Sequence, residues 1–182
     1  MSYLVFLGFF LLASITTSSG QTCSAVNNDF TPFCAKWGCG TVKFYIDPTC
    51  PFPFYICKNI FTKAFDTWEA QTCVNFAITS VKSQANIVLQ FLPIPGPHVA
   101  SATAPPSPQV ELTFDSGEIW AKGDTPPRPQ NSLDLHSVAL HLIGHAIGLR
   151  HRGNVPANKG TVMNKRLVDP DSGSVALVRI RL

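Results

Sequence analysis

The sequence contains few charged residues, and those it has do not gather into a stripe. Charged side chains make up 14% of the 182 residues, and the net charge is +3 with histidine neutral. Basic residues scattered in this way are typical of a solvated surface, so we expect no nucleic-acid partner. After residue 20 there is also no apolar run of the roughly twenty residues that crossing a bilayer requires, so we expect no membrane partner.

The first twenty residues contain no charged side chain at all. An apolar run over residues 3–13 is followed by small polar residues, and this run is too short to cross a bilayer comfortably. The pattern predicts a secretory signal peptide over residues 1–20, although its usual positive start is missing; an uncleaved anchor is the alternative. Residues 21–182 then suffice for one domain with a proper core, which we expect to be a monomer.

Six cysteines lie in the first third of the chain that follows this predicted signal. An even number in a secreted chain predicts disulfides, here three, and six cysteines allow fifteen pairings. None is near the histidines discussed below, which makes them poor candidates for metal ligands. The cysteines are Cys23, Cys34, Cys39, Cys50, Cys57 and Cys73.

Short runs of β-branched and aromatic residues predict four strands, and helical spacing predicts a helix of about fifteen residues after Pro53. Nine of the fifteen prolines lie between residues 93 and 129. We interpret this stretch as surface loops around the last of the four strands, which would lie near an edge. The final residues, 174–182, fit a short helix or a strand, and we favour the helix. The predicted strands are residues 42–46, 74–78, 86–91 and 110–115.

Residues 131–149 form the clearest predicted helix. Asn131 or Ser132 can cap its start, Asp134 suits its first turn, and Gly148 can end it in a left-handed turn. Nearly every side chain around its histidines is apolar, and a helix that is apolar all round is buried. We therefore expect this helix to lie within the core.

His141 and His145 lie four residues apart on this helix, so both rings lie on one face. Buried imidazoles need polar partners, because an unpaired buried polar group costs a few kcal/mol. His151 follows just past Gly148, which lets the chain reverse and bring a third imidazole to the same point. A histidine pair at this spacing is common and usually means little, but the triple with its glycine is far more specific. We predict one zinc ion held by the three imidazoles, with its fourth tetrahedral position open.

Leu142 stands where a zinc hydrolase of the H-E-x-x-H type has glutamate. That glutamate takes a proton from the attacking water and passes it to the leaving amine. Leucine can do neither, and losing a positioned general base costs about 10²–10⁴ in rate. We therefore predict that the site has no catalytic residue. The only glutamates of the chain lie outside the helix, at Glu69, Glu111 and Glu118.

At this point the sequence resembles the metzincins, whose pattern H-E-x-x-H-x-x-G-x-x-H it matches except at Leu142. Met163, in GTVMN, stands where family members carry a methionine turn beneath the metal; alone it would be an ordinary core methionine. Within the clan the chain is most similar to a matrixin, the catalytic domain of matrix metalloproteinases (peptidase family M10), and astacins are the second choice. The resemblance covers roughly residues 36–182. It is carried also by KWGCGTVKFYI, FTKAFDTWEAQTCVNFAI, VASATAPP and ELTFDSGEIW.

The resemblance implies an α+β fold of the zincin or metzincin type, with a twisted, mainly parallel sheet and about three helices. Asp115 and Glu118 match acidic calcium-binding positions of matrixins, but a shortened loop makes Ca²⁺ doubtful and favours two surface carboxylates instead. Ser101 and Thr113 replace two histidines of a structural zinc site, so we expect that second site to be lost. The two remaining histidines are expected to be ordinary surface or loop residues: His98 and His136.

These features predict a secreted, extracellular, matrixin-like protein that binds zinc but is catalytically dead or strongly impaired. Such a pseudoprotease would bind extended polypeptide, for example an extracellular matrix protein, along its cleft by adding a strand to the sheet edge. Two alternatives stay open. One is an active zinc endopeptidase of extracellular proteins with an atypical base, and the other is a metal-free structural extracellular protein.

Overall fold

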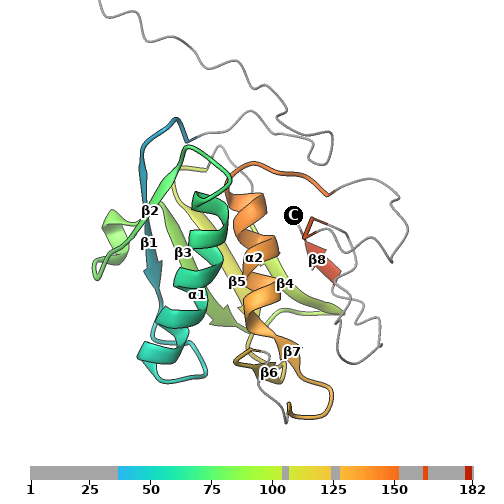
Figure 1. Cartoon of the computed structure of the whole chain (residues 1–182). Coiled ribbons are helices and arrows are strands. Elements are labelled where there is room, and N and C mark those ends of the chain that lie inside the picture. The colour runs from blue at the N-terminus through green and yellow to red at the C-terminus, as the bar shows by residue number, and fades with distance from the viewer. Residues whose placement is uncertain (1–36, 104–106, 124–127, 152–161, 164–178, 182) are drawn as a thin grey trace, which may run out of the picture.

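A computed structural model describes residues 37–103, 107–123, 128–151, 162–163 and 179–181. Two helices, α1 (Phe54–Glu69) and α2 (Leu135–Ala146), lie side by side against one face of a sheet (Figure 1). The predicted signal peptide, Cys23 and Cys34 lie outside the described residues. Within those residues, no helix is long and apolar enough to cross a membrane.

The sheet has six strands in the order β2-β1-β3-β5-β4-β8. Every pair is parallel except β4–β5, so the predicted α+β fold with a mainly parallel sheet is confirmed. A separate two-stranded ribbon joins β6 (Trp120–Ala121) to β7 (Leu133–Asp134), just before α2 begins. The strands of the main sheet are β1 (Thr41–Ile46), β2 (Asn75–Ile78), β3 (Ile87–Leu92), β4 (His98–Ala102), β5 (Val110–Asp115) and β8 (Arg179–Arg181).

Aromatic side chains fill the space between the helices and the sheet. The ring of Phe65 on α1 stacks on Phe44 of β1, with centroids 4.1 Å apart, and Phe61 lies 5.5 Å from Phe114 of β5. On β5 every second side chain is buried, because one face of the sheet lies under the helices. This core supports α2, which carries two of the three histidines of the candidate metal centre described below.

Two expectations about the proline-rich region were wrong. Residues 98–102 form β4 instead of loop, as the similarity of VASATAPP to a matrixin strand implies. The strand β5 does not lie near an edge, because β4 returns antiparallel along its outer side and β3 pairs with its inner side. Proline excludes a central strand only where it stands, and β4 contains none.

The expected helix near the end of the sequence is also wrong within the described residues, where β8 is a strand paired with β4. Its sequence alternates branched apolar and basic residues, a pattern that suits a strand once a partner is present. The open side of β4 supplies that partner. Of the roughly three helices expected, the described residues therefore hold α1, α2 and the short 3₁₀ turn η1 (Lys82–Gln84).

Two of the three predicted disulfides lie within the described residues. Cys39 pairs with Cys73, which ties the start of β1 to the segment before β2, and Cys50 pairs with Cys57 at the start of α1. Both disulfides therefore hold the β1–α1–β2 unit. The role of the cysteines as structural cross-links is confirmed for these four residues.

Candidate metal centre

The helix α2 begins one residue after Asp134, which is its N-cap. The Asp134 carboxylate accepts hydrogen bonds from the Ser137 backbone N–H at 2.8 Å and from the Ser137 hydroxyl at 2.6 Å. Neither Asn131 nor Ser132 is the cap, contrary to expectation. The β6–β7 pairing holds residues 133–134 extended, so the helical turn cannot start earlier.

The far end of α2 turns toward the third histidine as predicted. The helix ends at Ala146, and Gly148 adopts a left-handed conformation with φ 99°. The N–H groups of Gly148 and Leu149 donate to the carbonyls of His145 and Gly144, which completes the reversal. A residue with a side chain would be strained at position 148, so this glycine is required by the turn that presents His151.

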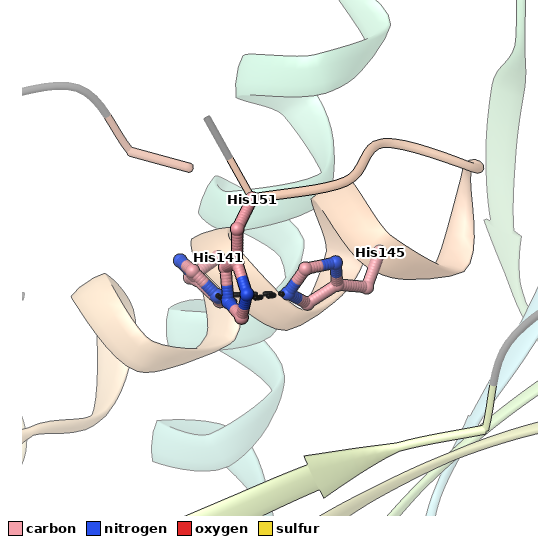
Figure 2. A group of neighbouring side chains, drawn as sticks. All are labelled: His141, His145 and His151. Carbon is pink, nitrogen blue, oxygen red and sulfur yellow. Dashed lines mark hydrogen bonds between the residues drawn. The ribbon is translucent and has the colours of Figure 1, made fainter. Parts of the chain in front are cut away.

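Three imidazole rings converge at one point, as Figure 2 shows: two from α2 and one from the segment that follows it. The Nε2 atoms of His141 and His145 are 2.9 Å apart. The Nε2 atom of His151 lies 3.1 Å from that of His141 and 3.2 Å from that of His145. The sequence-based grouping of these three residues is thus reproduced in space.

The outer nitrogens of two rings fix where their protons lie. The Nδ1–H of His141 donates to the Val162 carbonyl at 2.6 Å, and that of His145 donates to the Leu149 carbonyl at 2.7 Å. A carbonyl oxygen only accepts, so in the neutral rings each Nε2 is left with a lone pair. These lone pairs point toward each other across 2.9 Å. Such an arrangement is unfavourable unless a cation lies between them.

Burial also keeps these rings neutral. It lowers the pKa of His141 to about 3, an effect that the charge of His145 reinforces and the bond to Val162 opposes. Burial likewise lowers the pKa of His145, against the effect of its bond to Leu149. Metal ions bind the neutral imidazole, so the site favours the ligand form that a metal needs.

The geometry fits zinc well. Three nitrogens at 2.0–2.1 Å from a tetrahedral zinc would lie about 3.3 Å from one another. The three observed separations, from 2.9 to 3.2 Å, come close to this value. The carbonyls that orient two of the rings are the outer partners typical of zinc-binding histidines. The three residues can therefore hold a zinc ion and leave a fourth position for another ligand.

Leu142, at the position where the resemblance to metzincins implies a general base, has no polar side-chain atom. Its side chain is fully buried in the hydrophobic core. In the part of the chain that the structure describes, the group of possible metal ligands contains three imidazoles and no carboxylate. Glu69 has another role, since its carboxylate accepts the backbone N–H of Phe76 at 2.8 Å.

Met163 lies beneath α2, as the resemblance to metzincins implies. It is fully buried, and its sulfur packs against Gly144 between the two helical histidines. Gly144 was not among the site residues predicted from the sequence. The signal was present, because a glycine in the middle of a buried helix is costly unless another group needs its space. Here that group is the Met163 side chain.

The calcium candidates Asp115 and Glu118 do not form a ligand group of three within the described residues. The Asp115 carboxylate accepts the N–H groups of Ile94 and Gly117 and so joins the loop after β3 to the loop after β5. The Asp115 carbonyl accepts the indole N–H of Trp120. These contacts give Asp115 a structural role, and the expectation that Asp115 and Glu118 are surface carboxylates with a doubtful calcium role stays untested.

Ser101 and Thr113 lie directly opposite each other on β4 and β5. The Thr113 hydroxyl accepts a hydrogen bond from the amide of Gln90 on β3. The pair therefore lies within a row of polar side chains, and the loss of the second zinc site stays a prediction. His98 and His136 were expected to be surface or loop residues. Neither lies in a loop, since the first begins β4 and the second lies in the first turn of α2, but both are partly exposed, which agrees with the surface alternative.

Comparison with known proteins agrees with this centre. The matrixin family, peptidase family M10, matches residues 36–177. Metalloendoproteinase 1 of Glycine max is 32% identical over 160 residues, which cover 78% of this chain and 49% of that protein. Metalloendoproteinase 2-MMP of Arabidopsis thaliana is 32% identical over 125 residues, 60% of this chain and 32% of that protein. Matrilysin of Rattus norvegicus is 29% identical over 139 residues, 70% of this chain and 49% of that protein.

The chain spans about half of the length of these relatives or less. The family match nevertheless covers most of the chain, including both helices, every strand before β8 and the three histidines. Fold, ligand geometry and sequence similarity agree. The chain therefore belongs to the matrixin family of metallopeptidases.

Proposed function

We propose that this chain is a secreted matrixin that holds one zinc ion but hydrolyses peptides poorly or not at all. The observation that carries the proposal is Leu142, fully buried beside His141 at the position of the general base. The described residues bring no carboxylate to the three imidazoles. The ligand set supports zinc binding, and the missing base supports impaired chemistry.

The first part of the proposal, zinc binding, is supported by the Nε2 lone pairs of His141 and His145, which face each other. His141 and His145 each commit Nδ1–H to a backbone carbonyl, so their Nε2 atoms can bind a cation but cannot both donate to each other. Zinc bound there would polarise the carbonyl of a peptide. The residues of this chain orient the ligands and exclude water from two of the rings, which are at most 2% exposed.

The second part of the proposal, impaired peptide hydrolysis, depends on the need for proton transfer. Peptide hydrolysis requires a group that accepts a proton from the attacking water and returns it to the leaving nitrogen. Leu142 has neither a lone pair nor an acidic proton. Asp134, the acidic residue closest in sequence, is engaged at the start of α2 by two bonds to Ser137.

Two substitutions at position 142 test the proposal. Leu142→Glu restores a carboxylate, while Leu142→Gln introduces a side chain of the same size that cannot act as a base. We expect the glutamate variant to cleave casein or denatured collagen about 10²–10⁴ times faster than both the native chain and the glutamine variant. All three proteins should hold one zinc ion, measured by metal analysis after dialysis.

The same samples identify the outcome that would refute the proposal. If the native protein cleaves casein as fast as Leu142→Glu, and a chelator abolishes that cleavage, the chain is an active endopeptidase. The intact histidine set and the family of its relatives favour this second candidate. If the native chain holds less than about half a zinc ion, the metal-free structural alternative replaces both, since a working site is expected to fill.

The proposed ligand is an extended polypeptide that adds a strand to the sheet beside α2. The helix lies against β4 and β5, so the β4 side of the sheet is next to the helix that carries His141 and His145. Backbone pairing accepts many sequences, which suits a protein that captures an extracellular chain without cutting it. Binding of denatured collagen by Leu142→Gln, with no loss of substrate length on gels, is the expected result; absence of binding would contradict this ligand.

Secretion is part of the proposal and has its own support. Cys39–Cys73 and Cys50–Cys57 are disulfides, which persist in oxidising compartments. We expect cells that express the whole sequence to release it into the medium with a new N-terminus near Gln21. N-terminal sequencing of the released protein measures this directly, and retention of residues 1–20 on a membrane would favour the uncleaved anchor.

A further inference from the structure

The strand β8 (Arg179–Arg181) occupies the outer side of β4. His98 pairs with Arg179, Ala100 with Ile180 and Ser101 with Arg181, all in parallel. The other side of β4 pairs with β5. Without β8, β4 would be the edge of the sheet and would present a row of unpaired N–H and C=O groups.

This side of the sheet is next to the helix that carries two of the three histidines. The helix α2, which carries His141 and His145, lies against β4. Figure 1 shows β8 beyond β4, on the side of α2 that faces away from α1. A polypeptide that added a strand at this side would lie where β8 lies now.

We propose that β8 is an internal strand that closes the polypeptide-binding side of β4 and that an extended partner chain must displace it. The inference rests on the proposed function, because it concerns access to the same site. It gives the protein two states: a closed state in which β8 pairs with β4, and an open state in which β4 pairs with a second polypeptide chain.

The pairing of β8 is suited to exchange. The strand has three residues, and its register with β4 is interrupted between His98 and Ala100. Parallel pairs are slightly less stable per residue than antiparallel pairs. A partner that matched the five residues of β4 would form a longer ladder than β8 forms. By contrast, β5 pairs on both of its sides and is not free to exchange.

The position of β8 within the same chain explains how so short a strand can hold the site. A tethered strand has an effective concentration near the millimolar range, so it excludes weak free peptides without a tight contact. A partner is therefore expected to bind in proportion to the fraction of molecules whose β8 has left. Weakening β8 should raise the apparent affinity for peptide and leave the metal centre unchanged.

The test uses a variant with proline at two neighbouring positions, Arg179→Pro and Ile180→Pro. Neighbouring N–H groups of a strand point to opposite sides, so one of the two prolines removes a donor that faces β4. The matched control is Arg179→Lys with Ile180→Val, which keeps both N–H groups and the strand propensity. The probe is a fluorescein-labelled peptide copy of residues 174–182, SVALVRIRL.

We expect the proline variant to bind the probe at least about tenfold more tightly than the native chain and the control. Amide hydrogen exchange should rise in residues 98–102 of the variant and stay unchanged in residues 87–92. Equal probe affinity in all three proteins, or unchanged exchange in residues 98–102, would overturn the inference.

Zinc analysis of the same three samples separates this inference from the proposed function. One zinc ion in each protein, with peptide affinity that differs as expected, supports both. Missing zinc in the native chain contradicts the proposed function, while the exchange of residues 98–102 still reports on β8. If only the proline variant loses zinc, a variant truncated after residue 178 replaces it in the test. Probe affinity and amide exchange in residues 98–102 of that variant then decide.

Discussion

The sulfur of Met163 occupies the space beside Gly144 that any larger residue at that position would need. A Cβ atom added to Gly144 would also lie 3.0 Å from the indole ring of Trp68 on α1. The glycine thus lets the methionine, α1 and α2 approach one another at the residue before His145. The packing under the metal centre therefore depends on the absence of a side chain at position 144.

Replacing Gly144 by alanine should destabilise the protein by about 1–3 kcal/mol, because the new methyl group overlaps the Met163 sulfur in a packed core. In an exposed helix the same substitution would stabilise the protein, because alanine is a better helix former than glycine by about 1 kcal/mol. Urea unfolding measures the change. Gly38→Ala is the matched control, because nothing lies within 4 Å of a Cβ atom there. A Gly144→Ala protein as stable as the native chain would contradict the close approach.

The metal-free protein should lose stability as the pH falls below 6.5. The pKa of His141 is about 3 in the folded protein, below its usual 6.5, because burial disfavours the charged ring. Between these two pH values, His141 binds a proton in the unfolded chain but not in the folded chain. The free energy of unfolding should therefore be unaffected above pH 6.5 and fall by up to about 1.4 kcal/mol per pH unit below it.

Urea unfolding of chelator-treated protein between pH 4.5 and 8 tests this dependence. His145 adds to the slope, because burial lowers its pKa as well. The variant His141→Asn removes the main titrating group and should show a flatter profile. A native profile that stays level from pH 7 to pH 5 would mean that His141 accepts a proton in the folded state.

Removing zinc should lower the thermal midpoint of the native protein, because an ion that binds only the folded state stabilises it. With free zinc at a hundred times its dissociation constant, this contribution is about 2.7 kcal/mol. His145→Ala should abolish both the bound zinc and the response to chelator. His136→Ala, on the same helix but outside the ligand group, should keep both. A chelator response that survives in His145→Ala would place the metal elsewhere.

The two disulfides should differ in their contribution to stability. Cys39–Cys73 closes a loop of 34 residues and Cys50–Cys57 a loop of 7. In the chain-entropy account, the longer loop restricts the unfolded chain more, by about 1.4 kcal/mol from the ratio of the two lengths. Replacing Cys39 and Cys73 by serine should therefore cost more than replacing Cys50 and Cys57.

Denaturant unfolding of the two double-serine variants measures this difference, and peptide mapping of each variant checks that the other pair stays intact. Equal losses would show that contacts in the folded state, such as the packing of Cys57 within the core, outweigh loop length.

The spacing of the histidines is enough to predict which residues converge at the candidate metal centre. Two ligands on one helix face follow from the helical repeat, and Gly148 marks the reversal that brings His151 back. The absence of a base at Leu142 is equally a property of the sequence. The spacing of the histidines does not determine the orientation of their imidazole rings. That depends on the carbonyls of Leu149 and Val162, and Val162 lies 21 residues from its partner His141.

Local signals placed the cap of α2 at the wrong residue. Asn131, Ser132 and Asp134 are all suitable caps by residue type. The cap is Asp134 because β6 pairs with β7, which keeps the chain extended up to that residue. A contact between two distant short strands thus overrode the local preference.

The sequence by itself determined the grouping of the three histidines, the helices α1 and α2 and four of the strands, because these follow from periodicity and residue chemistry over short spans. Only the tertiary structure decided that β5 is interior, that residues 179–181 form a strand on β4, and that Met163 requires a glycine at position 144. The physical reason is the same in each case. Which strands pair and which side chains pack closely depends on residues far apart in the sequence. A local sequence pattern does not specify these partners.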